Sequence, residues 1–278
     1  MALGRWLHPL MMEDLCHTED KPLYPEMWFS PSVISVFCPR AWTIAYREGL
    51  GLVDRLGPDN RWWMDTGTAL HSMLQEKWLG PSGRIRGGWK CHDCGHVHGV
   101  DPDDKVQVFS HRKEHRDKVT ISSAIHMPGE CEACGMVPDW RWGFVYVEPL
   151  LYDLDLRVAG WTDGILDLPG QPPELVDFKV VGELKWVTSN PKPEHVIQLT
   201  WYLDMAGLPR GRIVYIDRTA KHLADAIKEH IVFHDEKVIQ KEKEKVRALR
   251  EALKDEEAPL PDCPHGGKLP WGPCDCAR

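Results

Sequence analysis

The sequence predicts an α/β fold, because segments typical of strands and of helices alternate along its 278 residues. Glu174–Val181 is a short apolar run after two prolines, which is typical of a buried strand. Gly67–Leu79 has helical periodicity, and Pro191–Gly207 reads as a second helix bounded by proline and glycine. The composition is globular, with 42% hydrophobic and 27% charged residues, and suits one domain plus an insert.

The other elements can be assigned in chain order. Residues 1 to about 28 are expected to be irregular or weakly helical, and a loop is expected through Gly57–Asn60. A linker of residues 256–261 leads to a cysteine-containing tail. Further helices are expected at Ser30–Gly49 and Asp235–Lys254, and further strands at Phe144–Pro149, Arg157–Leu168 (two strands and a turn), Arg212–Asp217 and His230–Phe233.

Two acids and a lysine are predicted to meet on neighbouring strands. Asp177 and Lys179 are two residues apart in one strand, so their side chains share a face, and the preceding turn presents Asp163 beside Asp177. Two carboxylates and water suit Mg²⁺ or Mn²⁺, which can activate water and polarise a phosphoryl oxygen. Lys179 would orient that water or stabilise developing charge. The alternative is a solvated Asp-x-Lys pair on an exposed face.

Three further polar residues occur at fitting positions on the predicted helices. His71 lies within one turn of an apolar helix face and could complete the coordination of the ion as a neutral imidazole; otherwise it is a satisfied core residue. Gln198 and Tyr202 are four residues apart, so they share one side of a helix. They either hydrogen-bond a phosphate or the lysine, or simply pack on the helix surface.

The order of these motifs resembles the RecB-like branch of the PD-(D/E)XK nuclease superfamily, which includes CRISPR-associated and phage exonucleases. The segment from Ser30 to Trp42 also resembles the first helix of that family, and the ordered set extends to Arg278. The resemblance implies a restriction-endonuclease-like core, with a mixed central sheet flanked by helices. It also implies metal ligands at His71, Asp163, Asp177 and the Val180 carbonyl, a catalytic Lys179, and support from Gln198 and Tyr202.

Two Cys-x-x-Cys-Gly motifs predict a zinc ribbon inserted at residues 87–142. They contain Cys91 and Cys94, then Cys131 and Cys134, and four thiolates at this spacing are a strong signal for tetrahedral zinc. Disulfides are the alternative, but no secretory signal is evident. The insert either folds as a metal-stapled lobe or also grips DNA. Between the motifs lie His96, His98, His111 and His115, which could substitute as ligands, and the basic residues Arg112, Lys113, Arg116 and Lys118.

A second cysteine set has one member near the N-terminus and three near the C-terminus: Cys38, Cys263, Cys274 and Cys276. The resemblance to the RecB-like branch implies that this set holds a [4Fe-4S] cluster as a clasp. Cys274-Asp-Cys276 has a one-residue gap where that branch more often has two, so zinc with His265 as a ligand is the rival interpretation. Cys16 is interpreted as a plain thiol.

The charge balance bears on the expected partner. A net charge of −8 and a pI of about 6.0 argue against tight nonspecific binding of nucleic acid. A local basic patch of Arg40, Lys179, Lys185, Lys192 and His195 could still steer a strand. Of these, the candidate DNA-binding residues are Arg40, Lys185 and Lys192. Trp62, Trp63 and Trp186 are either base-stacking platforms or packing residues.

Together these features predict a metal-dependent DNA exonuclease acting on single-stranded DNA or duplex ends, in recombination, repair, phage DNA processing or CRISPR adaptation. The alternatives are a non-catalytic DNA-binding module or a structure-specific endonuclease. DNA is the expected partner, with recombination or CRISPR-adaptation proteins as further candidates, and a cytoplasmic location without membrane contact is expected. The expected domains are an N-terminal helical part (1–86), the ribbon (87–142), the nuclease core (143–258) and the cysteine tail (259–278).

Overall fold

The computed structural model describes eleven stretches of the chain, which form two compact units. The larger unit comprises Trp28–Phe37 and Leu70–Glu244, and the smaller comprises Met1–Met27, Cys38–Ala69 and Lys245–Arg278. Within these bounds the described residues are 19–21, 28–48, 52–54, 58–101, 103–104, 118–139, 143–187, 189–255, 257–264, 268–269 and 272–273.

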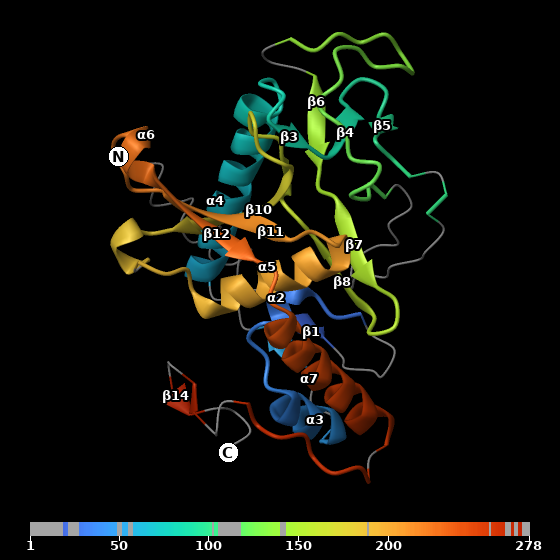
Figure 1. Ribbon diagram of the computed structural model, residues 1–278, viewed down its shortest axis with the longest axis vertical. Helices are drawn as coiled ribbons and strands as arrows, with labels where there is room; N and C mark the ends of the chain where they lie inside the picture. The colour runs from blue at the N-terminus through green and yellow to red at the C-terminus, as the bar shows by residue number, and fades with distance from the viewer. Residues whose placement is uncertain are drawn as a thin grey trace, which may run out of the picture. The chain divides into compact units, whose positions relative to one another are not determined.

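A mixed five-stranded sheet forms the centre of the larger unit (Figure 1). Within it β10 and β11 run parallel and the other neighbours antiparallel, which confirms the predicted α/β fold with a mixed sheet. Parallel neighbours need a crossover, which η2 (Leu184–Trp186) and α5 (Pro193–Ala206) provide. The strand order is β12 (Ile227–Phe233), β11 (Arg210–Asp217), β10 (Glu174–Val181), β9 (Gly164–Leu166) and β3 (Ile85–Arg86).

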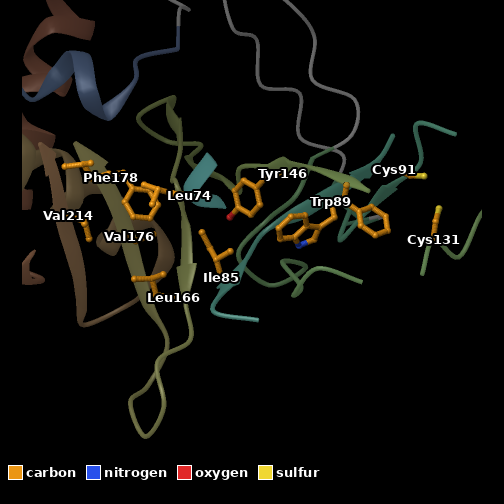
Figure 2. Packing of buried hydrophobic residues seen from close by; sticks show 12 residues of the cluster. Leu74, Ile85, Trp89, Cys91, Cys131, Tyr146, Leu166, Val176, Phe178 and Val214 are labelled. Carbon is orange, nitrogen blue, oxygen red and sulfur yellow. The ribbon is translucent and has the colours of Figure 1, made fainter. Parts of the chain in front are cut away.

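The apolar core continues from this sheet into the cysteine-containing lobe. Val176 and Phe178 are buried on the face of β10 opposite Asp177 and Lys179, as the alternation of the strand predicts. Figure 2 follows one buried cluster from these side chains to Trp89 and the cysteines of the lobe. The bridging side chains include Leu74, Ile85 and Tyr146.

Two smaller sheets complete the larger unit. The lobe contains the order β5-β4-β6, and β7 pairs with β8. The first strand of the predicted insert, β4, pairs with β6, which follows the insert in the chain. The expected domain division stays a prediction. The bounds are β4 (Gly88–Cys91), β5 (Val97–His98), β6 (Phe144–Val147), β7 (Leu150–Asp153) and β8 (Val158–Trp161).

The structure differs from the sequence prediction at one helix and at one loop. The single helix expected at Ser30–Gly49 is two, α2 (Pro31–Ile34) and α3 (Pro39–Arg47), because Cys38 precedes a proline and is extended at φ −108° and ψ 112°. The loop expected through Gly57–Asn60 is wrong at its end, since α4 (Pro58–Ser72) starts there with proline in the favoured first position. It continues as the π-helix η1 (Met73–Leu79).

The smaller unit contains α3 and the C-terminal part of α7 (Glu236–Lys254). Arg47 Nη2 at the end of α3 donates hydrogen bonds to the carbonyl oxygens of Asp255 at 3.1 Å and Ala258 at 2.7 Å. The remaining elements are β1 (Glu19–Lys21) paired with β2 (Leu52–Asp54), α6 (Leu223–Ala226) in the larger unit, and β13 (Lys268–Leu269) paired with β14 (Gly272–Pro273). In the part of the chain described, no helix is long and apolar enough to cross a bilayer.

Gly160 in β8 is a position of close approach, and its substitution should destabilise the larger unit. A Cβ atom there would lie 2.7 Å from Pro31 Cδ and 3.0 Å from Tyr202 Oη. We expect Gly160→Ala to lower the free energy of unfolding by about 1–3 kcal/mol, measured by urea denaturation. Gly129→Ala, where nothing lies within 4 Å of the added atom, is the control. Equal midpoints for the two variants would contradict the packing described here.

Candidate active site and metal centres

Three potential metal ligands converge from three separate segments of the larger unit. His71 lies near the end of α4, Glu148 follows β6, and Asp163 precedes β9. Each offers one ligand atom, and these atoms all lie within 4.8 Å of one another. His71 Nδ1 is 3.3 Å from Asp163 Oδ1. The antiparallel register, in which Gly164 pairs with Val176, brings Asp163 beside Asp177 of β10.

The sequence interpretation missed Glu148 and Gln75. Glu148 directly follows the apolar strand Phe144–Val147, and a lone acid after a strand is too common to stand out. Gln75 lies four residues after His71, so it falls on the same side of the helix, and it is buried. Its amide Nε2 donates a 2.8 Å hydrogen bond to the Asp163 carbonyl oxygen. The i, i+4 spacing was the available signal for Gln75.

The Asp163 carboxylate is oriented by the backbone of β10. The N–H of Phe178 donates a 2.5 Å hydrogen bond to Asp163 Oδ2. The other oxygen, Oδ1, is the one that faces His71. One carboxylate oxygen is therefore fixed by the sheet, and the second is directed toward the cluster.

Asp177, Lys179, Gln198 and Tyr202 form one hydrogen-bonded network. Asp177 is only 3% exposed, so the alternative of a solvated surface pair is wrong. Lys179 Nζ donates hydrogen bonds to Asp177 Oδ1 at 3.0 Å and to Gln198 Oε1 at 2.9 Å. Gln198 Nε2 in turn donates to Tyr202 Oη at 3.3 Å. Gln198 therefore contacts the lysine, as one of the two sequence interpretations expected.

Burial makes it costly for all the acids in this cluster to carry charge together. Burial is the main reason that the pKa of Glu148 rises to about 7, and the nearby Asp163 adds to the rise. Burial also raises the pKa of Asp177 to about 6, although the charge of Lys179 opposes the shift. For His71 burial lowers the pKa, but the hydrogen bond and charge of Asp163 outweigh it and leave that pKa raised.

The donor set of this cluster suits a hard divalent cation. Asp177 Oδ2 lies 2.9 Å from Lys179 Nζ without hydrogen-bond geometry, and this buried oxygen has no hydrogen-bond partner among the described residues. Carboxylate oxygens are the ligands that suit Mg²⁺ and Mn²⁺, and a cation would favour the charged forms that burial and carboxylate repulsion disfavour. Val180 lies in β10 opposite Ile216, and its part as a carbonyl ligand stays a prediction.

The four cysteines of the lobe are brought together as predicted. Cys91 Sγ lies 3.7 Å from Cys134 Sγ, and Cys94 Sγ lies 3.7 Å from Cys131 Sγ. These distances exclude disulfides and match the spacing of about 3.8 Å between two thiolates on one tetrahedral zinc ion with bonds of about 2.3 Å.

Each pair of lobe cysteines is shaped by a tight turn. The N–H of Gly95 donates to the Cys91 carbonyl oxygen at 3.0 Å, and the N–H of Gly135 donates to the Cys131 carbonyl oxygen at 2.8 Å. Both glycines have a left-handed backbone, with φ of 75° and 73°, which other residues adopt at a cost. The glycine after each cysteine pair is therefore required by the turn.

Two thiols of the second cysteine set lie in the described part of the smaller unit. Cys38 Sγ and Cys263 Sγ are 3.8 Å apart, whereas Cys274, Cys276 and His265 lie outside the described residues, as does Cys16. Two thiolates on one zinc ion are spaced about 3.8 Å apart. In a [4Fe-4S] cluster each cysteine binds a different iron atom, which separates the thiolates further. The two described thiols lie together as the sequence predicts, and the choice between zinc and an iron–sulfur cluster stays a prediction.

The predicted DNA-binding residues lie in different places. Lys185 in η2 is 64% exposed and pairs with Glu183, while Lys192 caps α5 and its N–H donates to Tyr215 Oη at 3.0 Å. Arg40 belongs to α3 in the smaller unit. Among the basic residues of the insert, Lys118 is buried against Asp104, so its side chain is not available to contact DNA. Arg112, Lys113, Arg116, His111 and His115, and the side chains of Trp62, Trp63 and Trp186, lie outside the described part.

Comparison with known proteins gives one family match. The family model of the PD-(D/E)XK nuclease superfamily matches residues 29–276. No curated protein matches the sequence. Among solved structures, that of SSO0001 is similar, with 15% sequence identity and a TM-score of 0.37. The alignment covers 94% of this chain and 90% of the SSO0001 chain.

Two structures of the enzyme LHK-Exo are also similar. The alkaline exonuclease LHK-Exo from Laribacter hongkongensis has 11% identity and a TM-score of 0.43, with 89% of this chain and 93% of its own covered. The structure of LHK-Exo in complex with dAMP has 12% identity and the same TM-score, and the alignment covers 82% of this chain and 89% of the LHK-Exo chain.

His195, on α5 near Lys179, is held as a neutral imidazole. Its Nδ1 lies 2.8 Å from Tyr215 Oη. Burial, assisted by the charges of Lys179 and Lys192, lowers the pKa of His195 to about 3. An unfolded chain would protonate this histidine near its ordinary pKa of about 6.5, so between these values the unfolded state binds the proton that the folded state excludes.

Acidification should therefore destabilise the protein through His195. Between pH 7 and pH 5 we expect this residue alone to reduce the free energy of unfolding by about 1 kcal/mol, allowing for its partial exposure. In His195→Gln, which keeps a hydrogen-bonding side chain but cannot titrate, the fall over this interval should be smaller by that amount. Urea denaturation at several pH values measures it. Parallel curves for variant and wild type would refute the assignment.

Proposed function

The chain belongs to the PD-(D/E)XK nuclease superfamily, and we propose that it is a Mg²⁺- or Mn²⁺-dependent DNA exonuclease. It would hydrolyse phosphodiester bonds in single-stranded DNA or at duplex ends. The observation that carries the proposal is the meeting of His71, Glu148 and Asp163 within one ligand shell, beside the buried Asp177 and Lys179. The preference for exonuclease action rests on the sequence resemblance to the RecB-like branch.

His71, Glu148, Asp163 and Asp177 would hold the divalent ion. The ion supplies Lewis acidity, which favours ionisation of water and polarises a phosphoryl oxygen. The protein positions its own ligands for this purpose, because the Phe178 N–H fixes one oxygen of Asp163 and Gln75 holds the Asp163 backbone. Glu148 and Asp177 titrate near neutral pH in the absence of a cation, so a bound ion would favour their charged forms.

Lys179 would act on the substrate as a fixed cation. Its ammonium group is held by hydrogen bonds to Asp177 and Gln198, and 19% of its side chain remains exposed. A positioned ammonium group can orient the attacking water and stabilise negative charge that develops on the phosphate in the transition state. Gln198 and Tyr202 would support catalysis by keeping that group in place.

The cysteine sites would stabilise the fold. We propose that Cys91, Cys94, Cys131 and Cys134 bind zinc, because their spacing fits one tetrahedral ion and the two turns present them together. The Met136 N–H lowers the pKa of the Cys134 thiol, but burial and neighbouring thiols outweigh it and raise that pKa to about 12. Without an ion the four groups would not all be thiolates at neutral pH.

Cleavage activity should depend on the acid cluster and on the lysine. We expect Glu148→Gln, Asp163→Asn and Lys179→Gln each to reduce the rate of DNA hydrolysis with Mn²⁺ by about 100-fold or more, since each removes a ligand or a charge-stabilising group. The measurement is release of nucleotides from end-labelled single- and double-stranded DNA. Circular dichroism would confirm that each variant is folded.

Matched controls separate a local effect from a change in overall charge. Lys221→Gln and Asp225→Asn make the same chemical changes at exposed positions and should keep wild-type rates. If the wild-type protein with Mn²⁺ or Mg²⁺ leaves all DNA substrates intact but still binds them, the non-catalytic DNA-binding interpretation replaces the nuclease.

The mode of cleavage is tested by the topology of the substrate. An exonuclease needs a free end, so we expect linear DNA to be degraded while covalently closed circular DNA of the same sequence persists. Nicking of the circle at a comparable rate would instead identify a structure-specific endonuclease.

Lys185→Gln and Lys192→Gln should weaken DNA binding and reduce its dependence on salt, if these lysines contact phosphates.

The second cysteine set should bind zinc if the distance between Cys38 and Cys263 reflects one shared ion. We expect colourless protein in which Cys263→Ser loses about one equivalent of zinc, measured by elemental analysis after anaerobic purification. Cys16→Ser, outside both cysteine sets, is the control. Brown protein that loses iron and sulfide in Cys263→Ser would establish the [4Fe-4S] cluster that the sequence resemblance implies.

A further inference from the structure

A second group of potential metal ligands lies beside the four cysteines of the lobe. His96 and His98 follow the first cysteine pair, and Glu132 lies between the two cysteines of the second pair. Each offers one ligand atom, and these atoms lie within 4.8 Å of one another. We propose that His96, His98 and Glu132 bind a second divalent transition-metal ion, distinct from the ion of the four thiolates.

His98 has the environment of a ligand without its ion. Its side chain is 4% exposed, and its Nε2 is buried without a hydrogen-bond partner among the described residues. Its Nδ1 lies 3.6 Å from Glu132 Oε1, which is too long for a hydrogen bond. Buried polar groups are nearly always satisfied. An ion bound at Nδ1 would give this nitrogen a partner on the side that faces Glu132, and it would leave the buried Nε2 unchanged.

The spacing of the three ligands suits a tetrahedral ion. With bonds of about 2.0–2.1 Å, nitrogen and oxygen ligands of zinc lie about 3.3 Å from each other. His96 Nε2 and His98 Nδ1 lie 2.8 Å and 3.6 Å from the same oxygen, Glu132 Oε1, and these distances bracket that value. The two imidazole rings are 4.6 Å apart and nearly perpendicular, so they approach the carboxylate from different directions.

The fold positions the two histidines of this group. His98 pairs with Trp89 in the β4–β5 ladder, and its ring packs edge-on against Phe144 of β6 at 5.3 Å. The His96 carbonyl oxygen accepts a hydrogen bond from the Cys91 N–H at 2.7 Å. The ligands come from both cysteine turns, so the ion would cross-link the two turns at the surface of the lobe.

The chemistry of the ligands defines the class of ion. Two neutral imidazoles and one carboxylate favour borderline ions such as Zn²⁺, Co²⁺ or Ni²⁺ over Mg²⁺ or Ca²⁺. Glu132 is 72% exposed, which leaves room for water as a fourth ligand. This proposal does not rest on nuclease activity, because none of the three residues belongs to the acid cluster.

Metal content of the full-length protein tests the proposal. After reduction, saturation with Zn²⁺ and gel filtration, we expect Glu132→Gln and His96→Gln to hold one zinc equivalent fewer than wild type, or to bind that ion about 10-fold or more weakly. Both side chains are exposed enough to be replaced without disturbing the core. Glu130→Gln, on the same turn, should retain the wild-type content.

Co²⁺ shows whether the loss is specific to this group. Wild type and Glu132→Gln should show the same thiolate-to-cobalt absorbance, because the four cysteines are unchanged, and differ only in the weaker absorbance of the additional ion. The proposal is overturned if both variants keep wild-type zinc content and affinity. It is also overturned if the thiolate absorbance falls in parallel, since the three residues would then only support the cysteine site.

Discussion

The register between β9 and β10 is the constraint on which the candidate active site depends. Pairing of Gly164 with Val176 sets Asp163 beside Asp177, and the Phe178 N–H then fixes one Asp163 oxygen. A slip of one residue would turn Asp177 and Lys179 toward the core and Phe178 toward the cluster. Burial of Val176 and Phe178 on the opposite face opposes that slip, so the apolar core determines where the polar groups meet.

The electrostatics of the cluster follow from this placement. Glu148, Asp163 and Asp177 are close together in an environment where charge is poorly solvated, and Lys179 pairs with Asp177. Burial is the main cause of the raised pKa values of Glu148 and Asp177, and repulsion from Asp163 adds to both, while Lys179 opposes the rise at Asp177. A divalent ion bound at this site, as proposed, would offset the negative charge of these carboxylates.

The cysteine lobe is coupled to the sheet by packing. The buried cluster that contains Phe178 of β10 also contains Trp89, Cys91 and Cys131 of the lobe (Figure 2). If the lobe binds zinc as proposed, folding around the ion would complete the same core that supports the acid cluster. The thiolate site would then support the acid cluster indirectly, through the position of β4 and its partner β6, which ends next to Glu148.

Features that depend on short spacing could be derived from the sequence alone. The alternation in Glu174–Val181 determined the shared face of Asp177 and Lys179, and the Cys-x-x-Cys-Gly turns determined the thiolate pairs, because backbone geometry fixes such neighbours. The tertiary structure decided the rest. Glu148 is a single acid after a strand, and His98 with Glu132 spans two turns, so only long-range packing brings these groups to their partners. Spacing along the sequence does not predict such contacts, because packing of the core creates them and the local backbone does not.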